Sequence, residues 1–234
     1  MSETKSTRNE VLLPKSELSL FGSMDNGNIP TLTNLVRHAI DDVPRAEIKK
    51  TLFVVGPHAS GKSALAKAAM IGDLYRFVDT GPVLRSYHTA DGPSMDFGPW
   101  IEMHEEHYGN NFTNDLLAGH IEASLANEAH EQHDIVVIGN RSYSGVERLG
   151  AVLAPDDSKV LYIDAPKELL YQRYCMRENK SLDRSEFQRL LDRDSAMGLD
   201  ELADHADWYV LNDGSFDEGV HAVGSKLNGW TTRT

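Results

Sequence analysis

Residues 56–63 carry the most specific chemical signal in the sequence, because they read Gly-Pro-His-Ala-Ser-Gly-Lys-Ser. They fit G-x-x-x-x-G-K-[ST] at every fixed position, a pattern typical of a loop whose backbone N–H groups wrap nucleotide phosphates. The glycines let the chain bend without a Cβ in the way. Lys62 would reach the β- and γ-phosphates, and the Ser63 hydroxyl would hold Mg²⁺. Since a strand precedes the loop and a helix follows it, we predict a nucleoside-triphosphate site rather than an ordinary glycine turn.

A second group of candidate residues follows the next predicted strand, where residues 79–85 read Asp-Thr-Gly-Pro-Val-Leu-Arg. An arginine guanidinium group is a permanent cation with paired donors that match phosphate oxygens. The segment resembles the Asp-Thr-Gly-x-x-x-Arg motif of cytidylate kinases and is similar to Thr-Gly-x-x-x-Arg of adenylate kinases. The resemblance implies that Arg85 grips the phosphate of an acceptor and that Thr80 or Asp79 contacts the acceptor nucleotide. The alternative is that Arg85 is a solvated helix residue.

Later segments extend this resemblance over residues 51–228. Their order is similar to that of an archaeal and bacterial group of P-loop kinases related to dephospho-CoA kinase and the nucleoside-monophosphate kinases. The matching pieces are Gly139-Asn140-Arg141-Ser142, Arg173 with Arg177, the charged segment 187–194, and Asn212-Asp213-Gly214-Ser215.

The resemblance gives these pieces roles. Arg141 would hold the acceptor phosphate beside Arg85, and residues 212–215 would run alongside the adenine ring of ATP. Arg173 and Arg177 lie one helical turn apart and would belong to a lid over the transferring group. Two alternatives stay open. The lid arginines could lie on an exposed helix face paired with Glu178, Asp183 or Glu186, and residues 212–215 could be a simple helix cap.

The predicted site residues fall into four overlapping groups. The catalytic group is Lys62, Arg141, Arg173 and Arg177. The ATP-binding group is Gly56, His58, Ala59, Ser60, Gly61, Lys62, Ser63, Ala64, Asn212 and Gly214. The acceptor-binding group is Asp79, Thr80, Arg85 and Arg141, and the magnesium ligand is Ser63, with Asp79 as a further candidate. His58 occupies a variable position of the loop, so we expect its backbone N–H to face phosphate and its side chain to point outward.

The sequence departs from the kinase pattern in two places. Related kinases carry an aspartate at the end of the third strand, where this chain has Ile138, and adenylate kinases have an acid at the position of Pro82. Asp79 or Asp164 could hold the water molecules of the metal instead, or Ser63 and the phosphates could suffice. A nucleotide-binding protein with weak or no catalysis therefore stays open.

Two further features have structural explanations that we prefer. His104 and His107 are spaced to share a metal on a helix, but no third ligand is evident, so we expect a solvated acidic face. Phe97, Trp100 and Tyr108 could line an acceptor pocket, although core packing is the simpler use.

The elements that must position these residues alternate between strand and helix. Strands are predicted at 51–55, 76–79, 134–138, 159–163 and 208–211. Helices are predicted at 60–71, 82–88, 99–108, 113–131, 167–178, 185–195, 199–205 and 216–227. Short apolar strands separated by helices indicate an α/β fold with a parallel sheet. The P-loop resemblance implies five strands in the order 2-3-1-4-5. Ligands of such sheets bind beyond the carboxyl ends of the strands, where every motif above lies.

Composition limits the functional classes. The 234 residues have 23 basic and 36 acidic side chains, for a net charge of −13, which disfavours non-specific nucleic-acid binding. No apolar run approaches the roughly 20 residues of a membrane span, and no signal peptide is expected. Cys175 is the only cysteine, so an internal disulfide is excluded and a cytoplasmic location is expected.

We expect a tail with a docking helix at 31–44 over residues 1–48, and a kinase domain over residues 49–234. An acceptor-binding segment at about 82–131 and a lid at about 173–193 would belong to that domain. The predicted function is ATP- and Mg²⁺-dependent phosphoryl transfer to a small nucleotide-like acceptor, most simply a nucleoside monophosphate. Two alternatives are a kinase of a hydroxyl acceptor, with Asp79 as the base, and an ATP-binding regulatory protein. A homodimer is left open.

Overall fold

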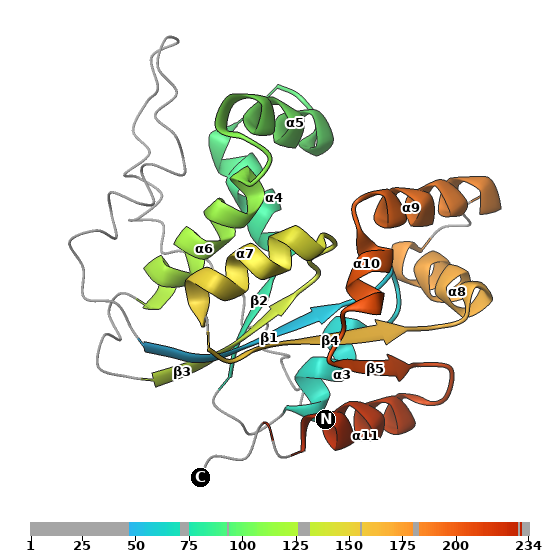
Figure 1. The fold of residues 1–234 in the computed structure, drawn as a ribbon. Helices are drawn as coiled ribbons and strands as arrows, with labels where there is room; N and C mark the ends of the chain where they lie inside the picture. The colour runs from blue at the N-terminus through green and yellow to red at the C-terminus, as the bar shows by residue number, and fades with distance from the viewer. Residues whose placement is uncertain are drawn as a thin grey trace, which may run out of the picture.

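The computed structural model describes residues 47–70, 75–92, 94–125, 132–154, 156–179, 183–228 and 230 (Figure 1). Residues 1–46 of the expected tail, with the docking helix at 31–44, lie outside the described residues, whereas Glu47 and Ile48 of that tail begin the first strand. The end of the helix predicted at 113–131 and residues 180–182 of the expected lid also lie outside the described residues. A membrane span needs a longer and more hydrophobic helix than any found in the described part of the chain.

Strands and helices alternate along the chain. The strands are β1 (Glu47–Val55), β2 (Tyr75–Asp79), β3 (Gln132–Ile138), β4 (Ser158–Asp164) and β5 (Trp208–Leu211). The helices are α3 (Lys62–Ala69), α4 (Thr80–Asp91), α5 (Phe97–Tyr108), α6 (Phe112–Leu125), α7 (Tyr143–Leu153), α8 (Lys167–Glu178), α9 (Arg184–Ala196), α10 (Leu199–Asp204) and α11 (Phe216–Leu227).

The strands form one five-stranded sheet in the order β2-β3-β1-β4-β5, and every pairing is parallel. This confirms the predicted fold class and strand order. Val54 pairs with Ile138 of β3 on one side and with Leu161 of β4 on the other, so the carboxyl ends of the central strands lie at one edge. The loops that follow β1, β2 and β3 therefore begin close together.

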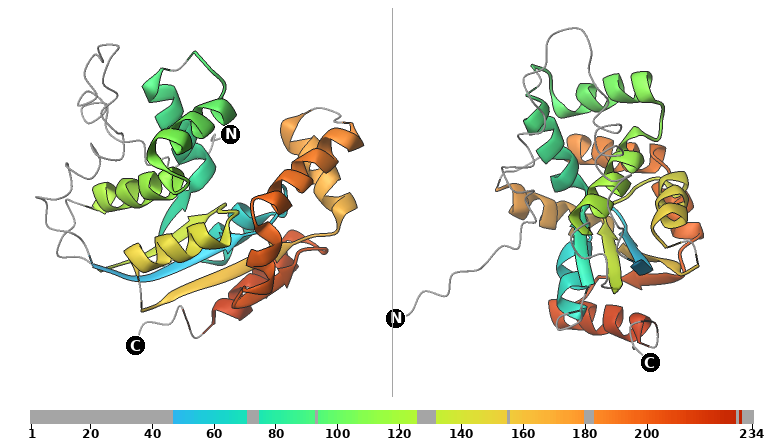
Figure 2. Two further views of the ribbon diagram at one scale, coloured as in Figure 1. Left: turned by 45° about the horizontal axis from the view of Figure 1, so that its top comes forward. Right: turned by 90° about the vertical axis from the view of Figure 1, so that its left-hand side faces the viewer.

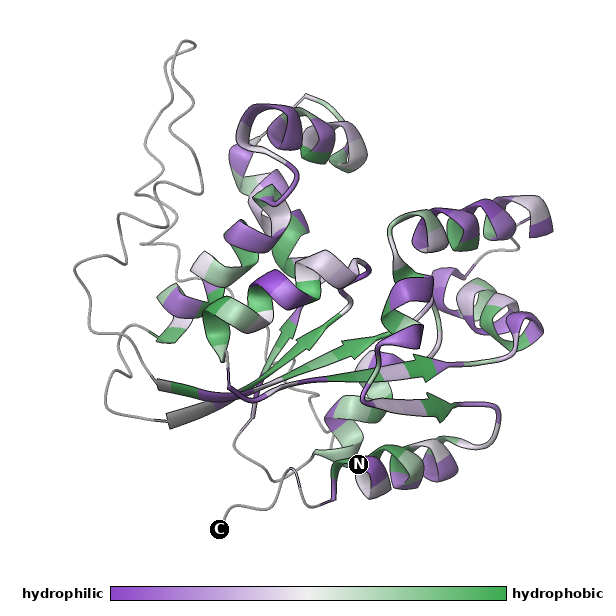
Figure 3. Ribbon diagram, in the orientation of Figure 1, coloured by the Kyte–Doolittle hydropathy of each residue, from purple (hydrophilic) through white to green (hydrophobic). Residues whose placement is uncertain are grey.

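Alternating side chains of the strands supply two separate cores. Phe53 and Val55 pack with residues of α6, α7 and α10, whereas Leu52 and Val54 pack with residues of α3 and α11. Figure 1 accordingly shows α6, α7 and α10 above the sheet and α3 and α11 below it, and Figure 2 shows the same layers from two other directions. The central strands β1 and β3 are hydrophobic over their carboxyl halves (Figure 3), as expected for strands that are covered on both faces.

Helix α7 has no counterpart among the predicted elements. It begins after Ser142, whose hydroxyl caps the helix by accepting from the backbone N–H of Gly145. A Cβ on Gly150 would lie 3.0 Å from Ser158 Oγ and 3.6 Å from Phe53, so this glycine lets the helix approach the sheet closely. Glycine has a low helix propensity, so local propensity does not predict α7. The packing of α7 against the sheet nevertheless requires glycines.

Helices α4, α5 and α6 share a small core of their own beside β2. Trp100 is fully buried there, which confirms that it is used for packing, and it donates from Nε1 to Asp91 Oδ2 at 2.8 Å. His104 is also buried, and its ring stacks on Phe112 at a centroid distance of 4.7 Å. The expectation that His104 lies on a solvated face was therefore wrong, because its position on α5 faces the aromatic cluster.

His120 provides a pH test of this packing. It is buried on α6 with Nδ1 3.2 Å from the hydroxyl of Tyr87, and burial lowers its pKa to about 4. Because the unfolded state takes up the proton near pH 6.5, the free energy of unfolding should fall as the pH drops from 6.5 toward 4. Between pH 7.5 and 5.0 the free energy of unfolding of the wild type should fall by up to about 2 kcal/mol more than that of His120→Gln. Urea denaturation at each pH measures both values.

His107→Gln is the matched control, because His107 is exposed on the neighbouring helix α5. This variant should follow the pH profile of the wild type. An identical profile for His120→Gln would contradict the assignment of a neutral, buried His120.

Candidate functional site

The loop at residues 56–63 connects β1 to α3 in a conformation that requires its glycines. Gly56 has φ +139°, and a Cβ there would lie 2.0 Å from the carbonyl oxygen of Ile163 on β4. Gly61 has φ +89°, and a Cβ there would lie 2.6 Å from Asn212 Nδ2. Ala59 also has a positive φ, of 62°. The backbone therefore turns tightly between β4 and the β5–α11 turn.

The residues of this loop fit an anionic group. The N-terminus of α3 has no side-chain cap, so the first N–H groups of the helix stay available to a phosphate. The Lys62 ammonium donates to the carbonyl oxygen of Pro57 at 2.9 Å, which holds it across the loop. Burial, followed by the charge of Arg141, lowers the pKa of Lys62 to about 8. The Ser60 hydroxyl is buried without a hydrogen-bond partner in the described part of the chain.

The proposed magnesium ligands lie together beside the loop. Ser63 Oγ donates to Asp79 Oδ1 at 3.0 Å, and Lys67 Nζ donates to Asp79 Oδ2 at 2.6 Å. Hydroxyl and carboxylate oxygens are ligands that Mg²⁺ prefers alongside phosphate oxygens and water, so this pair fits the ion. Within the described ranges no group of three or more His, Cys, Asp or Glu side chains could hold a metal by itself.

Asp164, the other acid considered for the metal, is already hydrogen-bonded. Its carboxylate accepts from the backbone N–H of Ala165 at 2.8 Å and from the hydroxyl of Tyr209 at 2.7 Å. Asp79 is therefore the better placed of the two acids, since it is the one that contacts Ser63.

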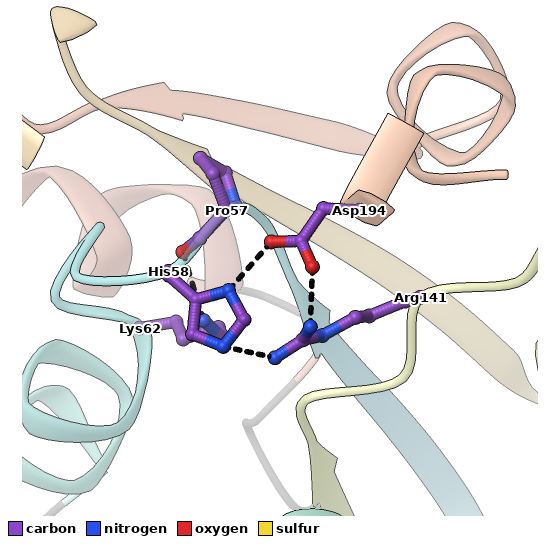
Figure 4. Close-up of polar contacts among 5 residues, drawn as sticks. All are labelled: Pro57, His58, Lys62, Arg141 and Asp194. Atoms are coloured by element: carbon purple, nitrogen blue, oxygen red, sulfur yellow. Dashed lines mark hydrogen bonds and ion pairs between the residues drawn. The ribbon is translucent and has the colours of Figure 1, made fainter. Parts of the chain in front are cut away.

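Arg141 lies directly against the phosphate loop (Figure 4). Its guanidinium group is hydrogen-bonded to Asp194 through Nη1 and to His58 Nε2 through Nη2, the latter at 2.6 Å. His58 Nδ1 lies 2.7 Å from the second carboxylate oxygen of Asp194. The expectation that the His58 side chain points outward was wrong, because Arg141 and Asp194 together hold the ring over the loop.

Thr80 and Arg85 are both on α4, in different surroundings. Thr80 is buried, and a Cβ on Gly139 would lie 2.9 Å from its hydroxyl, so it packs against the end of β3. Arg85 is exposed, and its guanidinium carbon lies 5.2 Å from the centre of the Phe97 ring. Burial lowers the pKa of Arg141 and the charge of Arg85 contributes in the same direction, so the two cations lie within electrostatic range.

The two arginines of α8 occupy separate positions. Arg173 donates to the carbonyl oxygen of Asn212 at 3.0 Å, and Asn212 Nδ2 donates to the carbonyl oxygen of Ser60 at 2.8 Å. This chain of contacts connects α8 to the phosphate loop through the β5–α11 turn. Arg177 Nε lies 2.9 Å from Glu178 Oε1, so Arg177 forms the surface ion pair given above as the alternative to a lid role. Its charge nevertheless contributes to lowering the pKa of Lys62.

Gly214 and Ala64, both predicted ATP-binding residues, are exposed. The turn that contains Gly214 ends in a capping box, in which Ser215 and Glu218 bond each other's backbone at the start of α11. The helix cap that the sequence offered as the alternative interpretation of residues 212–215 is therefore present. The cap does not involve the backbone of Asp213 and Gly214, whereas Asn212 donates from its backbone N–H to the carbonyl oxygen of Asp164 at 2.8 Å and accepts from Arg173.

Sequence reasoning missed the role of Asp194. This residue belongs to the charged segment 187–194, yet its side chain is only 1% exposed. A signal was present: Asp194 continues the apolar stripe of Phe187, Leu190 and Leu191 at helical spacing, so it lies on the buried face of α9. An acid at such a position needs a buried partner, and the sequence does not indicate which arginine that is.

Similar curated proteins come from archaea. The UPF0200 protein of Saccharolobus solfataricus is 26% identical over 173 residues, which are 72% of this chain and 87% of the relative. A UPF0200/UPF0201 protein of Archaeoglobus fulgidus is 33% identical over 100 residues, which are 41% of this chain and 30% of the relative. No family model matches the sequence.

Solved structures resemble this chain through its fold. TT1252 from Thermus thermophilus superposes with a TM-score of 0.52 at 18% identity and covers 80% of this chain and 100% of its own. A sugar kinase from Janibacter sp. HTCC2649 superposes with a TM-score of 0.51 at 16% identity, covering 77% of this chain and 95% of its own. The chain has a P-loop kinase fold. This architecture is shared with small-molecule kinases, and at such identity the likeness concerns the fold alone.

The close approach of Gly56 to β4 can be tested by substitution. Gly56→Ala should lower the free energy of unfolding by roughly 3 kcal/mol or more, because the Cβ would meet a backbone carbonyl at a positive φ. Gly98→Ala is the control, since a Cβ there has no neighbour within 4 Å, and it should stay within about 1 kcal/mol of the wild type. Urea denaturation measures both, and equal stabilities would contradict the loop geometry.

Proposed function

We propose that the protein transfers the γ-phosphoryl group of ATP to a small phosphorylated acceptor, and that this acceptor is a nucleoside monophosphate. The observation that carries the proposal is the position of Arg141, whose guanidinium Nη2 lies 2.6 Å from His58 within the phosphate loop itself. A second guanidinium, that of Arg85, lies within its electrostatic range. An arginine at the phosphate loop suits a reaction in which phosphate groups meet, and Arg85, exposed on α4, would supply a second guanidinium group to the acceptor.

On the ATP side, the uncapped start of α3 and Lys62 would receive the β- and γ-phosphates. Ser63 and Asp79 would hold Mg²⁺, directly and through water, and the bound ion would neutralise charge that develops on the transferring group. Gly214 would contact the adenine through its backbone. Asn212 would hold the turn in place, since its backbone N–H donates to the carbonyl oxygen of Asp164 and its carbonyl oxygen accepts from Arg173.

The contacts of Asp79 favour a phosphate acceptor over a hydroxyl acceptor. Both carboxylate oxygens of Asp79 accept from side chains of α3, Oδ1 from Ser63 and Oδ2 from Lys67, so the proposal uses this acid on the magnesium side of the site and not as a general base. A phosphate acceptor needs no base, and the arginines Arg85 and Arg141 would bind it. Thr80, Asp79 and the α4–α6 segment would then form the acceptor side.

The lid would be α8 and α9. These helices pack on each other through Leu170 and Phe187, apart from the two cores of the sheet. Arg177 lies on α8, where it pairs with Glu178, and its charge lowers the pKa of Lys62, so closure of the helix pair would carry it toward a transferring phosphoryl group.

An acceptor panel tests the proposal. Purified protein is incubated with Mg-ATP and with nucleoside monophosphates, nucleosides or dephospho-CoA, and ADP release is followed. A nucleoside monophosphate should stimulate release, and Lys62→Ala should remove nearly all turnover. Arg85→Ala should lower acceptor-stimulated turnover by roughly 10- to 100-fold, because a charged contact to phosphate is lost, while the affinity for ATP stays unchanged.

Arg148→Ala is the matched control for Arg85→Ala. Arg148 is a surface arginine of α7 that pairs with Asp115 at 2.7 Å, so its removal deletes the same charge away from the site. Stimulation by nucleosides alone would favour the hydroxyl-acceptor alternative. ATP binding without stimulation by any acceptor would favour a nucleotide-binding regulatory protein, a role that the apolar Ile138 at the end of β3 also suits.

A further inference from the structure

Three elements that are distant in the sequence meet at one buried carboxylate. Asp194 on α9 is hydrogen-bonded to Arg141, which follows β3, and to His58, which belongs to the phosphate loop. Arg141 and His58 are also bonded to each other, which closes a triangle of contacts (Figure 4). The side chains of Arg141, His58 and Asp194 are 21%, 16% and 1% exposed, so water has limited access to all three.

The position of Asp194 is determined by packing on both sides of it. Phe187 buries one end of α9, and Leu199 follows the helix into the core above the sheet. Between α9 and α10 the chain turns at Gly198, which has φ +99°, and a Cβ there would lie 3.7 Å from the carbonyl oxygen of Arg141. The base of α9 therefore rests on the segment that carries Arg141, and Asp194 is held at a fixed distance from it.

The contacts also assign the proton of His58. A guanidinium group only donates, so His58 Nε2 must present its lone pair to Arg141. His58 Nδ1 faces a carboxylate and must then carry the hydrogen. The ring is therefore neutral, as the Nδ1–H tautomer. In agreement, burial lowers the pKa of His58, and the charges of Arg141 and Lys62 oppose its protonation while Asp194 favours it.

We propose that Asp194 and His58 are positioning residues, which hold the Arg141 guanidinium group at the phosphate loop and thereby make α9 part of the nucleotide site. The inference rests on the proposed function for the role of Arg141. Neither residue needs to touch a substrate. Asp194 fixes one edge of the guanidinium group and His58 the other, so the remaining N–H groups of Arg141 are left for phosphate.

Binding and turnover should respond differently to the loss of the carboxylate. The charged groups around His58 are Asp194, Arg141 and Lys62, and the Tyr174 ring lies 6.3 Å away. Without Asp194 the two cations stay, so an anionic nucleotide should still bind. The orientation of Arg141 is lost, however, and with it the step that needs a defined geometry.

The first experiment reads the tautomer directly. Two-bond ¹H–¹⁵N correlation spectra of the full chain at pH 7.5 should show His58 as the Nδ1–H form, alongside His104, whose Nδ1 lies 2.8 Å from the carbonyl oxygen of Trp100. His58→Asn should remove only the first of these signals. In Asp194→Asn the His58 signal should change toward the Nε2–H form. This readout does not depend on any acceptor, so it stays decisive if the acceptor panel fails. An Nε2–H tautomer for His58 in the wild type would overturn the proposal.

The second experiment separates positioning from folding. Asp194→Asn should bind MgADP within about threefold of the wild type by calorimetry, while acceptor-stimulated turnover falls at least tenfold. Asp192→Asn, an exposed position on the same helix, should match the wild type in both. His58→Asn should reproduce the loss of turnover and serves as the second variant if Asp194→Asn does not fold.

A double variant completes the test. In an Arg141→Lys background the further change Asp194→Asn should lower turnover less than threefold, because the group that it positions is already gone. Independent, multiplying effects of the two changes would overturn the proposal, as would wild-type turnover in a folded Asp194→Asn protein.

Discussion

The site depends on one electrostatic constraint: the charges of Lys62 and Arg141 act on each other where both side chains are partly removed from water. Burial lowers the pKa of Lys62 to about 8, and the charge of Arg141 acts in the same direction. Asp194 opposes both effects, because it pairs with Arg141 and its charge favours the protonated form of Lys62. Interactions between charges strengthen as water is excluded, and an unpaired buried cation is costly. The loop, the end of β3 and α9 therefore stabilise one another.

The parallel sheet brings these charges together. Since β1 lies between β3 and β4, the loops after the three strands start side by side at one edge. The phosphate loop then passes so close to β4 that Gly56 has no room for a Cβ. The apolar strands fix the position of that edge, because their alternate side chains are buried against helices on both faces. A small displacement of a strand would move a charged group out of reach of its partner.

The two helical parts that flank the site are built differently from the central domain. The segment α4–α6 is packed around Trp100, and the pair α8–α9 around Phe187, each with an apolar cluster of its own. Only the pair α8–α9 has its cluster apart from both cores of the sheet, because α6 also packs with Phe53 and Val55. The fold itself does not define which acceptor is used, because similar folds serve many substrates.

Much of the fold could be predicted from the sequence. The five strands and their order follow from short apolar runs and from the resemblance carried by the loop at 56–63, and α8, β5 and α11 have the predicted boundaries. Helix α7 could not be predicted, because its glycines serve close packing against Asn114 and Ser158, a long-range requirement that local propensity does not report. His104 was misplaced for the same reason, since an aromatic cluster formed by two helices decides its burial.

By itself, the sequence determined the helices and strands and the phosphate-binding and charged residues that follow the strands. The reason is that helix and strand periodicity and the G-x-x-x-x-G-K-[ST] spacing are local properties of the chain. Only the tertiary structure decided which charges are paired. Asp194 lies 136 residues from His58 and 53 from Arg141, and their contact depends on how α9 and α10 rest on the end of β3. The tertiary structure also directs the His58 side chain toward the site. The buried carboxylate of Asp194 needs hydrogen-bond donors, and His58 and Arg141 supply them.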